Sequence, residues 1–205
     1  MTTPEPIESA PLPAAAAAAD ADARDAAWLA AIARGDRIAF ERLYLHHHPR
    51  LSRFVARQTG RRELVEEIVN EAFWIVWSNA ARFRGDSKPA TWIIGIAWRC
   101  MMKAVRRPVA TGIADLRDGA FEPRDDEGDD ARRDLCDWLQ AGLSTLPADQ
   151  RTTIELAYFL GQSCEEIAAI MECPVGTVKA RLFHARVRLR NALPGLAGES
   201  RRSGS

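Results

Sequence analysis

A short stretch near the C-terminal end of the sequence carries side chains that could bind nucleic acid. Between Pro174 and Arg190 there is no acidic residue, and the basic residues are Lys179, Arg181, Arg186, Arg188 and Arg190. Lysine and arginine bind the phosphates of DNA, and at the start of a helix they can also read base edges in the major groove. We therefore predict a DNA-binding segment. The alternative is an ordinary amphipathic hairpin of helices with a solvated cationic face.

Local signals predict that residues 161–190 form two helices joined by a tight turn. Ser163 and Glu166 have the spacing of a capping box, which starts the first helix. Pro174 cannot continue that helix but fits the first turn of the next. One face of the second helix is apolar, with Val175, Val178, Leu182, Ala185 and Leu189 at helical spacing. This is the pattern of a helix-turn-helix, and small residues keep its leading end slim: Gly176, Thr177 and Ala180.

Two other groups of residues invite a metal or catalytic interpretation. Consecutive helical residues point about 100° apart, so His46, His47 and His48 are not expected to converge on one ion. The acids of Asp115–Asp130 could suggest a metal-dependent enzyme, but they lie in Gly/Pro-rich sequence without a nearby histidine to help fix a geometry. We therefore predict no metal, no cofactor and no catalysis.

Composition places further limits on the function. The chain has 205 residues, 47% of them hydrophobic, and a formal net charge of zero, so no global field attracts it to nucleic acid or to a membrane. No segment reaches the length of about 18 apolar residues that a membrane span needs, and no secretory signal is visible, so we predict a cytoplasmic protein. The four cysteines lack metal or disulfide spacing and are expected to be free thiols, with a redox pair of Cys164 and Cys173 as the alternative.

The pattern of apolar residues is helical throughout, with no strand alternation, so we predict an all-α fold of two small domains. Eight acids and two bases between Asp115 and Asp130 give a local charge of −6 in Gly/Pro-rich sequence, which favours a disordered acidic linker. The predicted division is a disordered tail (1–24), an N-terminal domain (25–106), the linker (107–130), a C-terminal domain (131–193) and a second tail (194–205).

Helix boundaries within the domains follow from breakers and caps. Gly35-Asp36, Pro49 and Gly60 are expected to interrupt or end helices in the first domain. The sequence predicts further helices over Glu63–Trp77, 90–106 and Ala148–Leu160.

Five of the six tryptophans fall in the N-terminal domain: Trp28, Trp74, Trp77, Trp92 and Trp98. Core packing is the expected role of Trp74 and Trp77. Trp92 follows the basic loop Arg82–Lys88, where an aromatic ring could hold an unstacked base. Its alternative role is to anchor its own helix.

Four segments, in order, resemble the extracytoplasmic-function sigma factors, the two-domain branch of the bacterial sigma-70 family. They are AFERLY (Ala39–Tyr44), EEIVNEAFWIVW (Glu66–Trp77), TWIIGIAWR (Thr91–Arg99) and LP…EIAAIMECPVGTVKARLFHAR (Leu146–Arg186). The resemblance covers about Gly35 to Leu193. It implies an alternative initiation factor that binds core RNA polymerase and promoter DNA, and an anti-sigma factor as an inhibitory partner. The competing interpretation is a helix-turn-helix regulator that binds DNA independently.

The resemblance also implies three binding surfaces. Docking on the β′ coiled coil of the polymerase falls to Glu66, Glu67, Asn70, Glu71 and Trp74. Opening of the −10 element and capture of a flipped base fall to Phe83, Arg84, Ser87, Lys88, Trp92, Arg99, Lys103 and Arg106. Reading of the −35 element falls to Gly176, Thr177, Lys179, Ala180, Arg181, His184 and Arg188.

Further contacts follow from the same resemblance. The C-terminal domain is expected on the β flap, and the acidic linker is expected to enter the polymerase toward the RNA path. Three features depart from the family pattern, one of which is Glu67 in place of the common Asp. Asn70 replaces the usual Gln, and Trp98-Arg99-Cys100-Met101 replaces a small polar run, which changes the helix surface expected at the DNA.

Overall fold

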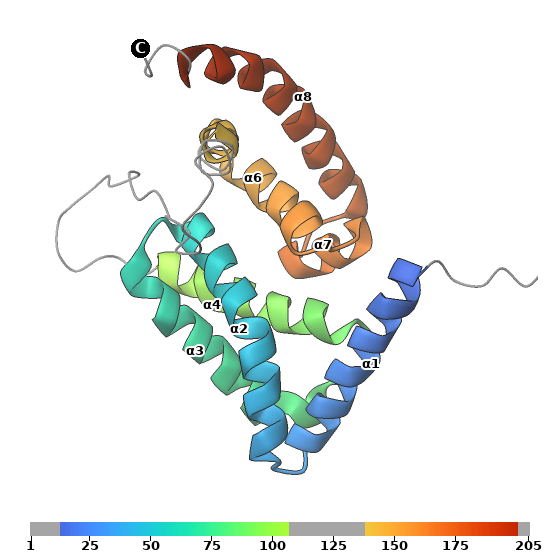
Figure 1. Ribbon diagram of the computed structural model, residues 1–205. Coiled ribbons are helices and arrows are strands. Elements are labelled where there is room, and N and C mark those ends of the chain that lie inside the picture. The colour runs from blue at the N-terminus through green and yellow to red at the C-terminus, as the bar shows by residue number, and fades with distance from the viewer. Residues whose placement is uncertain (1–12, 107–137, 201–205) are drawn as a thin grey trace, which may run out of the picture.

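Helices make up the regular structure of the chain. The computed structural model describes residues 13–106 and 138–200, and these ranges contain no strand (Figure 1). The longer helices are α1 (Pro13–Ile32), α2 (Arg37–Thr59), α3 (Arg62–Asn79), α4 (Pro89–Arg106), α6 (Ala148–Ile154), α7 (Cys164–Met171) and α8 (Val175–Ser200). The predicted all-α, two-domain class is confirmed. The linker predicted at 107–130 lies outside the described residues, and the exact domain boundaries stay a prediction.

The N-terminal half packs α1 to α4 around one apolar core. α3 lies against both α2 and α4, and α1 contacts α2 and α4 (Figure 1). Phe54 of α2, Phe73 of α3 and Ile93 of α4 are almost fully buried. Asp36 begins α2 by accepting hydrogen bonds from two backbone N–H groups, and Gly60 ends it in the left-handed conformation, φ 61°. Both breaks were predicted from the sequence, and both are confirmed.

α1 is longer than the sequence predicted. It begins at Pro13, so residues 13–24 are helical and do not belong to the disordered tail expected at 1–24. Alanine has the highest helix propensity of all residues, and the run Ala14–Ala19 therefore extends the helix backward. The end of α1 is held by packing, because Leu29 and Ile32 are buried in the core.

Two further helices also continue past points where the sequence predicted an interruption or a tail. α2 continues through Pro49, and α8 runs on to Ser200, past the tail expected to begin at 194. A proline removes one hydrogen bond from a helix but does not by itself forbid the turns on either side. In α2 those turns are held by Leu43 and Leu51, which are both buried.

The C-terminal half packs three short helical segments against the long helix α8, and its buried apolar residues join those of the N-terminal half in one cluster. Residues 138–144 are helical, and α6 passes into a π-helical turn, Glu155–Phe159 (η2), so that the run predicted for Ala148–Leu160 is present. α8 packs across α6 and α7 (Figure 1). The largest buried side chains here are Leu156, Ile167 and Ile170.

Trp74 differs from the core role expected for it. Its side chain is 67% exposed on α3, whereas Trp77 is partly buried and packs its ring 5.2 Å from that of Phe40. The helix pattern explains the difference, because the core face of α3 is already filled by Ile68, Val69, Ala72, Phe73 and Val76. Trp74 therefore lies on the outer face.

Candidate nucleic-acid interface

The helix-turn-helix predicted at 161–190 is present and has well-formed ends. The Ser163 N–H donates to Glu166 Oε2 at 2.7 Å, and the Glu166 N–H donates to Ser163 Oγ at 3.2 Å, which completes the capping box. Glu172 ends α7 in the left-handed conformation, φ 52°. α8 then starts at Val175, and the Thr177 and Val178 N–H groups donate to the Pro174 carbonyl. The turn between the two helices is therefore set by local backbone chemistry.

α8 separates a packed face from an exposed one. Val178, Leu182 and Ala185 are buried against the other helices. The exposed residues of its leading part are Gly176, Lys179, Ala180, Phe183, His184, Arg186 and Arg188, while Thr177 is half-buried. This slim end with a lysine and a histidine is the surface that a major groove can receive.

Arg181 is half-buried, whereas the other basic residues between Val175 and Arg190 are exposed. Its guanidinium forms an ion pair with Asp149 of α6 and donates to Cys173 Sγ at 3.6 Å. The side chain thus ties the recognition helix to α6. Its base-reading role stays a prediction, and this tie gives it a positioning role that the sequence did not suggest. Cys164 and Cys173 are both free thiols.

Phe183 is a surface residue that sequence reasoning missed. It is 62% exposed, and its ring lies 5.4 Å from that of His184. The signal was present in the sequence, because Phe183 lies off the apolar face set by Val178 and Leu182. An aromatic side chain outside the buried face of a basic helix is a candidate contact for DNA.

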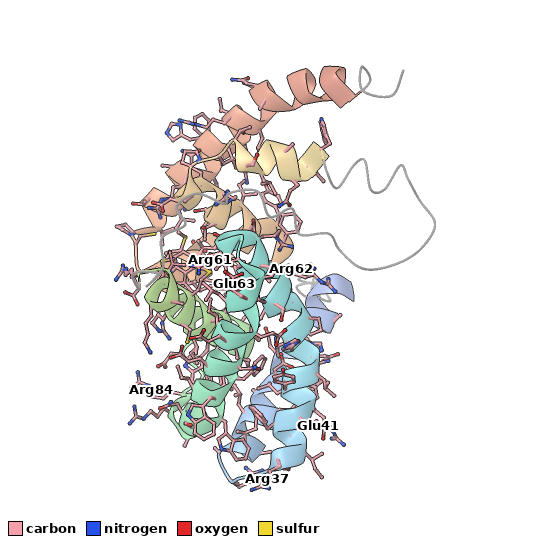
Figure 2. The ribbon with its side chains drawn as sticks, turned by 90° about the vertical axis from the view of Figure 1, so that its left-hand side faces the viewer. Arg37, Glu41, Arg61, Arg62, Glu63 and Arg84 are labelled. Atoms are coloured by element: carbon pink, nitrogen blue, oxygen red, sulfur yellow. The ribbon has the colours of Figure 1, made fainter. Side chains whose placement is uncertain are left out.

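The loop before α4 and one stripe of α4 form the second candidate surface. Arg84 points away from the helices into solvent (Figure 2), where it pairs with Asp86 at 3.1 Å. Phe83 and Trp92 are both half-buried, with ring centroids 5.4 Å apart. Ser87 is half-buried and Lys88 exposed. Farther along α4, three exposed cations follow Trp92 at helical spacing: Arg99, Lys103 and Arg106.

The polymerase-docking residues predicted on α3 are mostly exposed together. Glu66, Glu67, Asn70 and Trp74 all face solvent, spaced as neighbours on a helix surface. Glu71 is half-buried and turns toward α4, where Lys103 Nζ donates to its carboxylate at 2.8 Å. Glu71 therefore contributes less to the exposed face than the sequence indicated.

The two halves of the chain contact each other through polar side chains. Arg57 Nε lies 3.0 Å from Glu155 Oε2, and the Glu155 side chain is 1% exposed. Burial raises the pKa of Glu155, and the charge of Arg57 offsets this only in part. The Thr152 hydroxyl also donates to Gln58 Oε1 at 2.7 Å. A buried acid thus lies at the junction, held by a cation from the other half.

A second set of contacts covers the start of α4. The Thr91 hydroxyl donates to Gln162 Oε1 at 2.7 Å in a buried position, and Lys88 Nζ lies 3.1 Å from Glu166. The hydrogen bond and the charge of Glu166 raise the pKa of Lys88. These two contacts lie where α7 packs beside α4 (Figure 1). Part of the second candidate surface is therefore already in contact with the helix-turn-helix.

Comparison with protein families finds two matches in chain order. The family model described as "Sigma-70 region 2" matches residues 43–109, and the one described as "Sigma-70, region 4" matches residues 136–189. The described residues contain no helix long and apolar enough to span a membrane.

Similar proteins carry corresponding names. The chain is 32% identical over 185 residues to the RNA polymerase sigma-H factor of Pseudomonas aeruginosa, which covers 82% of this chain and 93% of that protein. It is 31% identical over 176 residues to the ECF RNA polymerase sigma-E factor of Escherichia coli K12, covering 80% and 92%.

Solved structures share the fold. A structure of CnrH with the cytosolic domain of CnrY matches with a TM-score of 0.61 at 24% identity, covering 84% of this chain and 98% of that one. The sigma factor RpoE with the anti-sigma factor NepR, from Bartonella quintana, matches with a TM-score of 0.60 at 25% identity, covering 76% and 96%.

Proposed function

Because the chain belongs to the extracytoplasmic-function sigma factors of the sigma-70 family, we propose that its three exposed surfaces divide the work of starting transcription. As a member of this family it binds core RNA polymerase and directs initiation at specific promoters. The observation that carries the division is the separation of faces on α8. Its packed residues Val178 and Leu182 are buried, while Lys179 and His184 face solvent.

The leading end of α8 is proposed to read the −35 element. Lys179 and His184 can reach base edges, and Gly176 and Ala180 allow a close approach of the backbone. Arg188 lies farther along the helix, where phosphate contact is expected. Arg181 would hold the helix at the correct angle through Asp149, in addition to any contact with a base. Phe183 adds an apolar surface beside His184.

The loop before α4 is proposed to open the −10 element. Flipping a base out of the duplex costs a few kcal/mol, which stacking and a preformed pocket can offset. Arg84 and Lys88 supply positive charge for the backbone, and Phe83 with Trp92 supplies an aromatic surface. Arg99, Lys103 and Arg106 would extend the cationic track along α4.

The exposed face of α3 is proposed to dock on the polymerase. Acidic side chains there would repel DNA phosphates, so a protein partner fits this face better. Trp74 is the expected anchor, since exposed tryptophans at the centre of an interface commonly contribute most of its binding energy. Its neighbours Glu66, Glu67 and Asn70 would form the polar surround.

The contact between the two halves is proposed to belong to the resting protein. Lys88 pairs with Glu166, and the adjacent Thr91 is held by Gln162, so we propose that the halves separate before the −10 element is opened. An anti-sigma factor is the expected inhibitory partner, as the RpoE–NepR complex suggests by its name. Without polymerase the chain is proposed to have no catalytic activity of its own, and its work is proposed to be cytoplasmic.

Replacing Trp74 with alanine tests the docking assignment. We expect affinity for core polymerase to fall by about 2 kcal/mol, roughly 30-fold, with unfolding unchanged because the side chain is exposed. Leu45→Ala is the matched control, since Leu45 is an exposed apolar residue of α2. Unchanged co-purification of the Trp74→Ala chain with core polymerase would exclude this face.

An assay with the full chain and core polymerase distinguishes a sigma factor from a helix-turn-helix regulator that binds DNA independently. Promoter binding and transcription are measured with the full chain alone and with core polymerase added. A sigma factor requires the polymerase for specific binding and supports transcription without another sigma factor. Tight, specific binding by the chain alone, with no transcription from core enzyme, would favour the regulator.

A further inference from the structure

The contact between α1 and α2 contains a buried carboxylate. Asp25 of α1 is 3% exposed and His47 of α2 is 6% exposed, and His47 Nε2 lies 2.8 Å from Asp25 Oδ2. Burying a carboxylate inside a helical bundle is costly unless positive or polar groups compensate it. Asp25 and its surroundings are therefore a built polar site inside an otherwise apolar contact.

A cation already lies beside this carboxylate. Arg24 Nη2 lies 3.0 Å from Asp25 Oδ1 and 2.8 Å from His46 Nε2. A guanidinium can only donate hydrogen bonds, so His46 Nε2 is the acceptor and its lone pair points at Arg24. A positive charge is thus held between an imidazole lone pair and a carboxylate oxygen, which are groups that also bind metal ions.

The geometry overturns the expectation that neighbouring histidines cannot converge. Ligand atoms of Asp25, His46 and His47 all lie within 4.8 Å of one another. Within residues 13–106 and 138–200, this is the group of at least three His, Cys, Asp or Glu side chains that could hold a metal ion. Side chains reach farther than their Cβ directions suggest, and Asp25 comes from another helix to meet both rings. His48 turns away, with its ring 4.7 Å from that of Tyr44 and its Nε2 3.6 Å from Glu66.

We propose that Asp25, His46 and His47 form a binding site for a divalent transition metal ion such as Zn²⁺, with Arg24 as an internal cation that competes for it. Two imidazoles and a carboxylate are suitable ligands for such ions. Tetrahedral zinc with bonds of about 2.0–2.1 Å needs ligand atoms about 3.3 Å apart, so small side-chain rotations suffice. The fourth position would hold water.

Binding requires two local changes. His47 must offer the lone pair of Nε2, so in the metal-bound state the neutral ring carries its single proton on Nδ1. Arg24 must leave, and Trp28 provides a place for it, since the guanidinium already lies 4.8 Å from the centre of that ring. The metal would then tie α1 directly to α2.

None of the three proposed metal ligands belongs to the proposed docking, −10 or −35 surfaces. Arg24 and Asp25 precede the segment matched by the region 2 family model, which begins at residue 43. α1 contacts α2, α4 and η1 (Ala80–Arg82), so a metal there would fix α1 against the helices that carry the docking and −10 surfaces. If no metal binds at this site, the proposed function is unaffected.

Cobalt binding to the tag-free, metal-stripped full chain tests the proposal. Co²⁺ is titrated and followed by absorbance and by thermal unfolding, with Zn²⁺ as competitor. We expect one ion to bind, to raise the unfolding temperature, and to give no near-ultraviolet band of cobalt–thiolate charge transfer. No binding, or a thiolate band that shows cysteine ligation, would overturn the site.

Three variants make the test specific. His46→Gln should weaken binding at least about tenfold, while His48→Gln, the matched neighbour outside the group, should leave it unchanged. Arg24→Gln should tighten binding about tenfold by removing the competing cation. Equal affinity in His46→Gln and the parent, or weaker binding in Arg24→Gln, contradicts the proposal. If His46→Gln does not fold by circular dichroism, the Arg24→Gln result decides.

Discussion

At the leading end of α8, Lys179 and Ala180 face solvent, whereas at the start of α4 Thr91 and Lys88 are engaged by Gln162 and Glu166 of the other half. One DNA-facing surface is therefore open in this arrangement and the other is partly occupied. The helix-turn-helix supplies both the open surface and the residues that occupy the second one. On the proposed assignment of these surfaces, exposing the −10 surface requires moving the −35 reader, which would couple the two steps of promoter recognition.

Breaking the buried Arg57–Glu155 ion pair should have the largest effect on the contact between the two halves. Arg57→Met leaves Glu155 buried without its cation, and removing one partner of a buried pair costs about 3–5 kcal/mol. The halves can escape this cost by separating. We expect the radius of gyration from small-angle X-ray scattering to rise and the unfolding temperature to fall.

Arg61→Met is the control for that experiment. Arg61 pairs with Glu63 at 3.0 Å at the exposed start of α3 (Figure 2), and exposed pairs contribute little to stability. It should change neither measurement. A parent-like radius in Arg57→Met would show that the buried pair does not hold the halves together.

Lys179→Ala tests the exposed surface at the leading end of α8. A lost base contact should reduce discrimination between cognate and scrambled −35 sequences by about 1–3 kcal/mol. Arg190→Ala should instead weaken both sequences equally and reduce the salt dependence of holoenzyme binding. Both are measured by competition binding with assembled holoenzyme. Equal losses on both sequences for both variants would remove the distinction.

Trp92→Ala tests the covered side. If Trp92 stacks on an unpaired base, its loss should cost about 1–3 kcal/mol in opening, so transcription should fail on closed duplex and survive on a template with a pre-melted bubble. The alternative is that Trp92 anchors α4 against Phe83, 5.4 Å away between ring centroids. In that case the variant loses thermal stability and fails equally on both templates.

Acidification should produce the smallest shift in the equilibrium between a closed form, in which the two halves are in contact, and an open form, in which they are apart. Burial raises the pKa of Glu155 in the closed form, against the nearby charges of Arg57 and Arg151, so the closed form binds its proton more tightly than the open form does. Closure should therefore be favoured as pH falls through the raised pKa of Glu155, and this advantage should disappear as pH rises above it. The radius of gyration should show the trend in the parent and lose it in Glu155→Gln.

Features governed by neighbouring residues could be predicted from the sequence. The Ser163–Glu166 capping box, the Asp36 cap and the Gly60 stop each depend on a few adjacent groups, and all are present. The packed face of α8 followed from helical spacing alone. The same local reasoning failed for residues 13–24 and Pro49, where helix propensity and packing outweigh the breakers.

Features that join distant segments could not be predicted. The Arg57–Glu155 pair links residues 98 positions apart, and its two side chains show no pattern in sequence. Arg181 looked like a free base reader because Asp149 is far away along the chain. The convergence of the histidines depended on Asp25, which only the packing of α1 brings near.

The separation of faces on α8 has a consequence for how promoter preference can evolve. Val178, Leu182 and Ala185 hold the helix in place, while Lys179, Ala180 and His184 lie outside the packed core. If the second set reads bases as proposed, substitutions there would alter the recognised bases without disturbing the scaffold. On the proposed −35 role, a few surface changes would therefore shift promoter preference while the packing of α8 stays the same.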